Sequence, residues 1–312
     1  MAELLEAVRF VHFAAAMAAF GIGAFRLYAF AGDPAPAQAP ARMALDRTLA
    51  RTMTASATVA LISALAMVPC VAAEMAAMSS AALDPLILRV VLFATEFGHV
   101  WCWHVGFAIA LLALCAIPLG RWHAATTTTA ALLTLVSLGW VGHATMDMGG
   151  VAVHEVNQMV HLIAAGIWLG GLVPLGILLR RATRPEGDQY IPLARTALPH
   201  FSQMGYAAVA LVALTGLVNG VFLVGSAKAL TATPYGRLLI VKIVLFTAMV
   251  GLAMVNRFRL MPSLRRAETV TVPLRALFRS VVAEQALALA ILAVVAVLGT
   301  WEPAIHMAVK MQ

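Results

Sequence analysis

The sequence predicts an all-α, polytopic transmembrane helical bundle with eight spans. Its composition is the first observation behind this prediction: 62% of the residues are hydrophobic and 11% are charged, and the mean hydropathy is +0.91. Soluble domains are about half apolar and about a quarter charged. The second observation is a series of eight apolar stretches, each near the roughly 20 helical residues that cross about 30 Å of hydrocarbon. The chain is therefore expected to be a multi-pass membrane protein.

The predicted spans cover residues 4–28, 50–72, 97–117, 124–142, 154–179, 203–224, 237–257 and 278–299. The first stretch starts with MAELLEAVRF, which is acidic where a signal peptide is basic, so we interpret it as a span. Residues 85–96 are also apolar and are expected to form an interfacial helix or a tilted extension of the third span. The spans divide into an N-terminal four-span half, 1–153, and a C-terminal four-span half, 154–312.

The basic residues predict the orientation, because cytoplasmic loops retain an excess of Lys and Arg. Fifteen of the 21 Lys and Arg residues lie in or beside the connections after spans 1, 3, 5 and 7. They are Arg26, Arg42, Arg47, Arg51, Arg121, Arg180, Arg181, Arg184, Arg195, Arg257, Arg259, Arg265, Arg266, Arg275 and Arg279. Both termini are therefore expected in the periplasm, with the protein in the bacterial inner membrane. We expect membrane lipid rather than nucleic acid to surround these charges.

Histidine and methionine are concentrated on the predicted outer side. The stretch 143–161, HATMDMGGVAVHEVNQMVH, alone holds three histidines and three methionines. Imidazole and thioether together form a ligand set that suits copper. No glycine-rich phosphate loop of an ATPase is present in the sequence, and no enzyme activity is predicted. The pattern predicts a copper ion taken up from outside the membrane.

Three histidines on different spans reach a similar depth. At a rise of 1.5 Å per residue, His12, His104 and His161 each lie roughly 10 to 12 Å below the outer boundary. Ionisable groups at such depth normally face the bundle interior or a wet cavity and carry a function. We therefore expect these imidazoles to converge in a shallow metal pocket that is reached from outside.

Further candidate ligands precede this level. His154 lies seven residues before His161, which separates the two by about 10.5 Å along one helix face and excludes a shared ion. We interpret them as successive stations for copper. The preceding loop contributes the first candidate ligands, which are His143, Met146, Asp147 and Met148.

Four segments of the C-terminal half form a recognisable series. They are HLIAAGIWLGGLVPL (161–175), FSQMGYAAVALVALTGLVNGVFLVGS (201–226), TPYGRLLIVKIVLFTAMVGLAMVNRFRLMP (233–262) and AEQALALAILAVVAVLGTWEP (283–303). Together these segments resemble the copper resistance protein D family of inner-membrane proteins. The resemblance implies eight spans, a periplasmic copper-binding partner and copper transport toward the cytoplasm. It also favours His161 as a ligand.

Two other functions fit the same histidines. A b-type haem oxidoreductase uses paired histidines as axial ligands, and His12, His104 and His161 are candidates for such a pair. A copper receptor that does not translocate its ion is the other alternative.

Overall fold

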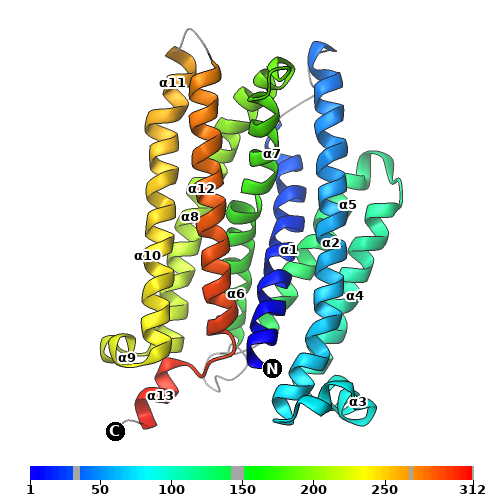
Figure 1. Cartoon of the computed structure of the whole chain (residues 1–312), viewed down its shortest axis with the longest axis vertical. Helices are drawn as coiled ribbons and strands as arrows, with labels where there is room; N and C mark the ends of the chain where they lie inside the picture. Colours follow the sequence, from blue (N-terminus) through cyan, green and yellow to red (C-terminus); the bar gives the residue numbers. More distant parts are fainter. Residues whose placement is uncertain (31–35, 142–150, 267–269, 311–312) are drawn as a thin grey trace.

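The computed structural model describes residues 1–30, 36–141, 151–266 and 270–310. Every regular element within these ranges is a helix, and the long helices run side by side along one axis (Figure 1). The predicted helical bundle is therefore confirmed.

Among the residues that the structure describes, seven helical segments are long and apolar enough to cross a membrane. Five are single helices: α1 (Ala2–Tyr28), α2 (Ala39–Met75), α4 (Glu96–Ala116), α8 (Ile191–Val224) and α12 (Thr271–Leu298). Two are interrupted by a π-helical turn: α6 (Val151–Ala165), η6 (Gly166–Gly170) and α7 (Leu172–Ala182), and then α10 (Pro234–Val255), η8 (Asn256–Leu260) and α11 (Met261–Arg266). The short elements are η1 (Pro36–Gln38), η2 (Ser79–Leu83), α3 (Pro85–Ala94), η3 (Gly120–Trp122), η7 (Asp188–Tyr190), α9 (Ala227–Ala232) and α13 (Ala304–Lys310).

The remaining predicted span, 124–142, corresponds to a shorter element. Helix α5 (His123–Val136) has 14 residues and continues into the four-residue 3₁₀ turn η4 (Ser137–Trp140). It runs beside α4 (Figure 1) but falls short of the roughly 20 residues of a typical span. The count of eight spans therefore stays a prediction.

Both chain termini lie at one end of the bundle, and the arginine-bearing ends of α7 and α11 lie at the other (Figure 1). This arrangement separates the two ends by charge, because α7 ends with Arg180 and Arg181 and η8 carries Arg257 and Arg259. The assignment of the termini to the periplasm remains a prediction from the charge bias.

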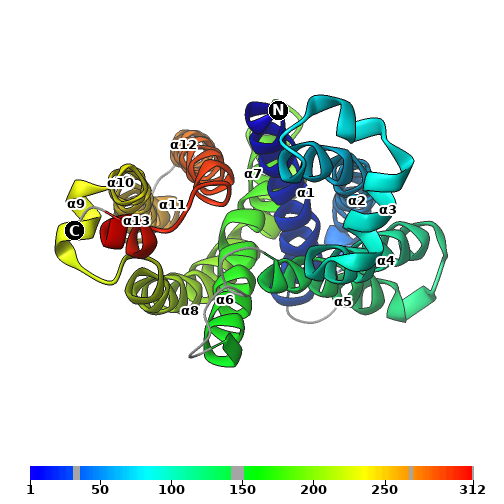
Figure 2. The same cartoon turned by 90° about the horizontal axis from the view of Figure 1, so that it is seen from below.

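Helix α1 occupies the centre of the molecule (Figure 2). It packs against α2 and α5 of the N-terminal half and against η6, α7 and α12 of the C-terminal half. Glycines permit the closest of these contacts: a Cβ atom on Gly21 would lie 2.1 Å from the carbonyl carbon of Gly170, and one on Gly23 would lie 2.6 Å from Thr128 Oγ1. Small residues in membrane interfaces serve this purpose. The division into halves at 153/154 remains a prediction.

Residues 85–96 do not extend α4. Helix α3 is a separate helix that begins at Asp84, whose carboxylate accepts from the backbone amides of Leu86 and Ile87. The chain becomes extended at Thr95, and the Thr95 hydroxyl caps the start of α4. Of the two alternatives for this segment, the separate helix is the one observed.

Candidate functional site

His12 is held in a fixed orientation by the neighbouring helix α2. Its Nδ1 atom lies 3.1 Å from the Ala60 carbonyl and 3.0 Å from Ser63 Oγ. A carbonyl can only accept a hydrogen bond, and the Ser63 hydroxyl donates its own proton to the Val59 carbonyl at 2.6 Å. Nδ1 therefore carries the ring proton. The lone pair of the neutral imidazole is left on Nε2.

His104 on α4 is held in the same way by η4. Its Nδ1 atom lies 2.8 Å from Ser137 Oγ, and the Ser137 hydroxyl donates to the Thr134 carbonyl at 2.9 Å. Ser137 thus accepts from His104, and the lone pair of this ring is again on Nε2. Metal-binding histidines typically donate their second nitrogen to such a partner, which fixes the tautomer and the orientation of the ring.

The two rings contact each other. The centroids of His12 and His104 are 4.8 Å apart at an interplanar angle of 67°. Both side chains have 0% exposed surface. Within the described part of the chain, neither Nε2 atom has a hydrogen-bond partner. Buried polar atoms nearly always have one, so two such atoms on rings that contact each other call for an explanation.

Trp101 forms one wall of this histidine pair. Its ring stacks on His104 with a centroid distance of 4.6 Å and lies 5.7 Å from His12, and its indole nitrogen donates to the Ala64 carbonyl at 2.9 Å. Because Trp101 is 1% exposed and both histidines are fully buried, the pair is closed off from solvent. The expected pocket open to the outside is thus not observed at these residues. A ligand needs a local opening to reach them.

The described residues contain no group of three or more His, Cys, Asp or Glu side chains arranged to hold a metal. The expectation that His161 shares one site with His12 and His104 is therefore not met. His161 on α6 instead faces α8, where its Nδ1 lies 2.8 Å from Thr215 Oγ1.

His161 belongs to a polar seam between α6 and α8. Asn157 Nδ2 donates to the Asn219 side chain at 2.8 Å, and Asn219 Nδ2 donates to Gln158 Oε1 at 2.9 Å. His154 is 2% exposed and stacks on Phe222 with a centroid distance of 4.7 Å. The Nδ1 atom of His154 is buried without a partner in the described structure. The seam thus carries His154 and His161 as two separate imidazoles.

The other candidate ligands cannot be placed. His143, Met146, Asp147 and Met148 lie outside the residues that the structure describes. Their role as first ligands for copper stays a prediction.

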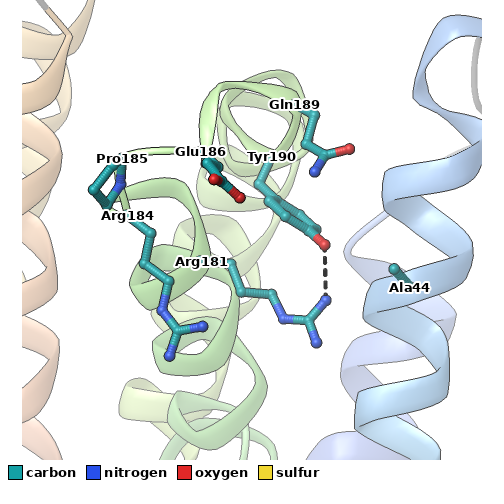
Figure 3. Close-up of a pocket in the computed structure, with 7 residues that line it drawn as sticks. All are labelled: Ala44, Arg181, Arg184, Pro185, Glu186, Gln189 and Tyr190. Atoms are coloured by element: carbon teal, nitrogen blue, oxygen red, sulfur yellow. Dashed lines mark hydrogen bonds between the residues drawn. The ribbon is translucent and has the colours of Figure 1, made fainter.

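Two hollows lie at the arginine-rich end of the bundle. One, of about 520 Å³, is lined by Arg181, Arg184, Glu186 and Tyr190, and Arg181 donates to the Tyr190 hydroxyl at 2.9 Å (Figure 3). These hollows involve none of the candidate ligands.

The two serines that contact the histidine rings were not predicted from the sequence. Ser63 and Ser137 stand within the apolar spans 50–72 and 124–142, and this polarity was the available signal.

A haem does not fit between the two rings. Metal–nitrogen bonds of about 2 Å on both faces of a porphyrin hold the imidazole centroids roughly 6 Å apart. The observed 4.8 Å is shorter, and the rings touch edge to face with no exposed surface between them. The arrangement favours a single small ion over a macrocycle.

The fold and the site together define a multi-pass helical membrane protein with a buried, ligand-ready histidine pair. The sequence profile described as "Copper resistance protein D-like, N-terminal domain" matches residues 1–153, and the profile described as "Copper resistance protein D" matches residues 195–298. The chain belongs to the copper resistance protein D family, and it is a multi-pass inner-membrane protein.

Three curated relatives support this assignment. The inner membrane protein YebZ of Escherichia coli K12 is 31% identical over 95% of this chain and 97% of its own length. Copper resistance protein D of Pseudomonas syringae pv. tomato is 29% identical over 95% of this chain and 96% of its own length. Copper transport protein CutJ of Bacillus subtilis 168 is 31% identical over 56% of this chain and 33% of its own length. No solved structure matches the chain.

Proposed function

We propose that this protein handles copper, taking it from the periplasmic face and passing it toward the cytoplasm, and that the histidine pair is its main binding site. Membership of the family and the names of two relatives, a copper resistance protein and a copper transport protein, support the choice of metal. The observation that carries the site is the pair of buried, unpartnered Nε2 atoms on His12 and His104.

Copper is the cargo in this proposal. The Nε2 atoms of His12 and His104 are its two nitrogen ligands, while Ser63, Ser137 and the Ala60 carbonyl keep both rings in the ligating tautomer. Two copper–nitrogen bonds of about 2 Å meeting at a trigonal angle place the centroids about 5.5 Å apart. The ring centroids, now 4.8 Å apart, therefore need to separate by about 0.7 Å to hold one ion.

A thioether is the natural third ligand, because it selects the cuprous ion. Met67 is 2% exposed and lies four residues after Ser63 on α2. Residues 60, 63 and 67 share one face of a helix, and the first two already contact His12. We therefore assign Met67 as the third ligand.

His154 and His161 serve as separate stations along the α6–α8 seam, and the ion moves between stations by ligand exchange. A periplasmic copper-binding protein delivers the ion to His143, Met146, Asp147 and Met148. Carboxylates at this mouth attract the cation.

The test is the copper content of the purified full chain. After loading with cuprous ion and removal of the excess, elemental analysis should find about one tightly held copper in the wild type. His12→Ala and His104→Ala should each lose it. His99→Ala is the matched control, because His99 lies on the same helix as His104 but is exposed and bonded to the Phe93 carbonyl. Retention of the copper by both His12→Ala and His104→Ala would refute the site.

A further inference from the structure

A carboxyl group is buried within the C-terminal part of the bundle, away from any histidine contact. Glu284 lies in the middle of α12 and is 2% exposed. An ionisable residue at such a position in a membrane helix is costly and normally serves a function. The copper proposal does not use it.

The partner of Glu284 is Asn256, the first residue of the π-helical turn η8. Asn256 Nδ2 donates to Glu284 Oε1. The other end of this amide, Oδ1, is buried and has no hydrogen-bond partner among the described residues. Single π-helical turns within α-helices are frequent at functional sites. This π-helical turn thus begins with an amide side chain whose nitrogen has a hydrogen-bond partner and whose oxygen has none among the described residues.

The orphaned oxygen bears on the protonation of the carboxyl group. An ionised carboxylate only accepts hydrogen bonds, so it leaves Asn256 Oδ1 without a donor. A protonated carboxyl has one O–H group. Facing an amide, it closes a ring of two hydrogen bonds, in which Nδ2–H donates to Oε1 and Oε2–H donates to Oδ1. This neutral ring satisfies both side chains, whereas the charged form satisfies one.

A further oxygen lies one turn away. Ser280 precedes Glu284 by four residues and so shares its face of α12. Its hydroxyl oxygen is also buried without a partner in the described structure. The carboxyl of Glu284, the amide oxygen of Asn256 and the hydroxyl of Ser280 are oxygen groups, which form a poor set for copper and can hold a proton.

Charged groups do not stabilise an ionised Glu284. Helix α12 packs against α1, α7, α10, α11 and η8. Within the described part of the chain, no ion pair or hydrogen bond joins an ionisable group on these elements to the Glu284 carboxyl, whose hydrogen-bond partner is Asn256. The described ionisable groups on these elements are Glu3, Glu6, Arg9, His12, Arg26, Tyr28, Arg180, Arg181, Tyr235, Arg237, Lys242, Arg257 and Arg259.

A hollow lies beside the same turn. A hollow of about 700 Å³ at the arginine-rich end is lined by Arg257, Phe258 and Met261, directly after Asn256 in the chain. Within η8, Asn256 contacts α12 through Glu284, and the next two residues, Arg257 and Phe258, line this hollow.

We propose that Glu284 is a proton-binding site, which holds its proton between Oε2 and Asn256 Oδ1 and exchanges it with water through the hollow beside η8. Uptake converts the carboxylate to the carboxylic acid and closes the hydrogen-bonded ring. Release leaves a carboxylate in an apolar interior and breaks the ring, which loosens η8 from α12. This proposal does not depend on the copper site.

Infrared spectroscopy of the copper-free, full-length protein tests it. The wild type at neutral pH should show the C=O band of a buried carboxylic acid, and Glu284→Gln should remove that band. Glu74→Gln, at an exposed position near the end of α2, should retain it. Asn256→Ala should shift the band upward, because the acid loses its acceptor. A spectrum without an acid band that depends on Glu284 overturns the proposal, and an unshifted band in Asn256→Ala overturns the pairing.

Thermal unfolding as a function of pH gives a second measurement. Glutamine has the shape of the protonated acid and should fold. The midpoint of the wild type should fall as the pH rises, because the unfolded chain releases this proton more readily than the folded state does. The midpoint of Glu284→Gln should follow a flatter profile. Parallel profiles for the two proteins also overturn the proposal.

Discussion

The crossing of α1 and η6 should be intolerant of a single added methyl group at Gly170. A Cβ atom there would lie 2.0 Å from the Met17 carbonyl oxygen and 2.8 Å from its carbonyl carbon. The shortest ordinary carbon–oxygen contacts are about 3.3 Å long. The two backbones must therefore separate by about 1.3 Å. Neither backbone can rotate away as a side chain would. We therefore expect Gly170→Ala to cost at least the 1–3 kcal/mol that is typical of overpacking.

Thermal unfolding of the detergent-solubilised protein measures this cost. At about 2–4 °C per kcal/mol, the midpoint should fall by several degrees. Copper affinity should fall as well, because Met17 lies on α1 five residues from His12 and the displacement moves that ring.

Gly106→Ala is the matched control. Gly106 lies within α4, and a Cβ atom there would meet nothing within 4 Å. Alanine should even stabilise this helix, by up to about 1 kcal/mol. Equal midpoints for the Gly170→Ala, Gly106→Ala and wild-type proteins would refute the close crossing of α1 and η6.

Three further predictions concern the site. Ser137→Ala removes the hydroxyl that accepts a hydrogen bond from His104. It should raise the copper dissociation constant about 10- to 100-fold, as the loss of an outer-shell partner usually does. Ser63→Ala should have a smaller effect, because a backbone carbonyl also accepts from His12. Calorimetric titration distinguishes these results, and equal effects contradict the assignment. His161→Ala should leave the tightly bound copper in place but slow copper uptake into proteoliposomes; loss of that copper would place His161 in the main site. The purified protein should show no Soret absorbance, and a haem spectrum that disappears in His104→Ala would restore the haem alternative.

The depth of the histidines along their helices was the feature of the site that could be predicted from the sequence. Hydropathy located the helices, and the rise per residue placed His12, His104 and His161 at one level. The rotation of each helix about its axis is set by packing, which hydropathy does not encode. Helix α6 directs His161 toward Thr215 on α8, whereas α1 and α4 direct their histidines toward each other.

The supporting residues were harder to predict for a related reason. Ser63 and Ser137 act only because α2 and η4 bring their hydroxyls to the two rings, across separations of 51 and 33 residues. A serine in an apolar span is also an ordinary helix residue that bonds its own backbone. Only the arrangement of the helices shows which serines meet a histidine.

X-ray absorption at the copper edge of the loaded wild-type protein tests the central claim most directly. The account predicts one copper site with two imidazole nitrogen ligands at about 2 Å and one sulfur ligand at about 2.3 Å. The imidazole scattering should be lost in the protein that carries both His12→Ala and His104→Ala. A wild-type spectrum without imidazole scattering, or one that the double substitution leaves unchanged, would contradict the account.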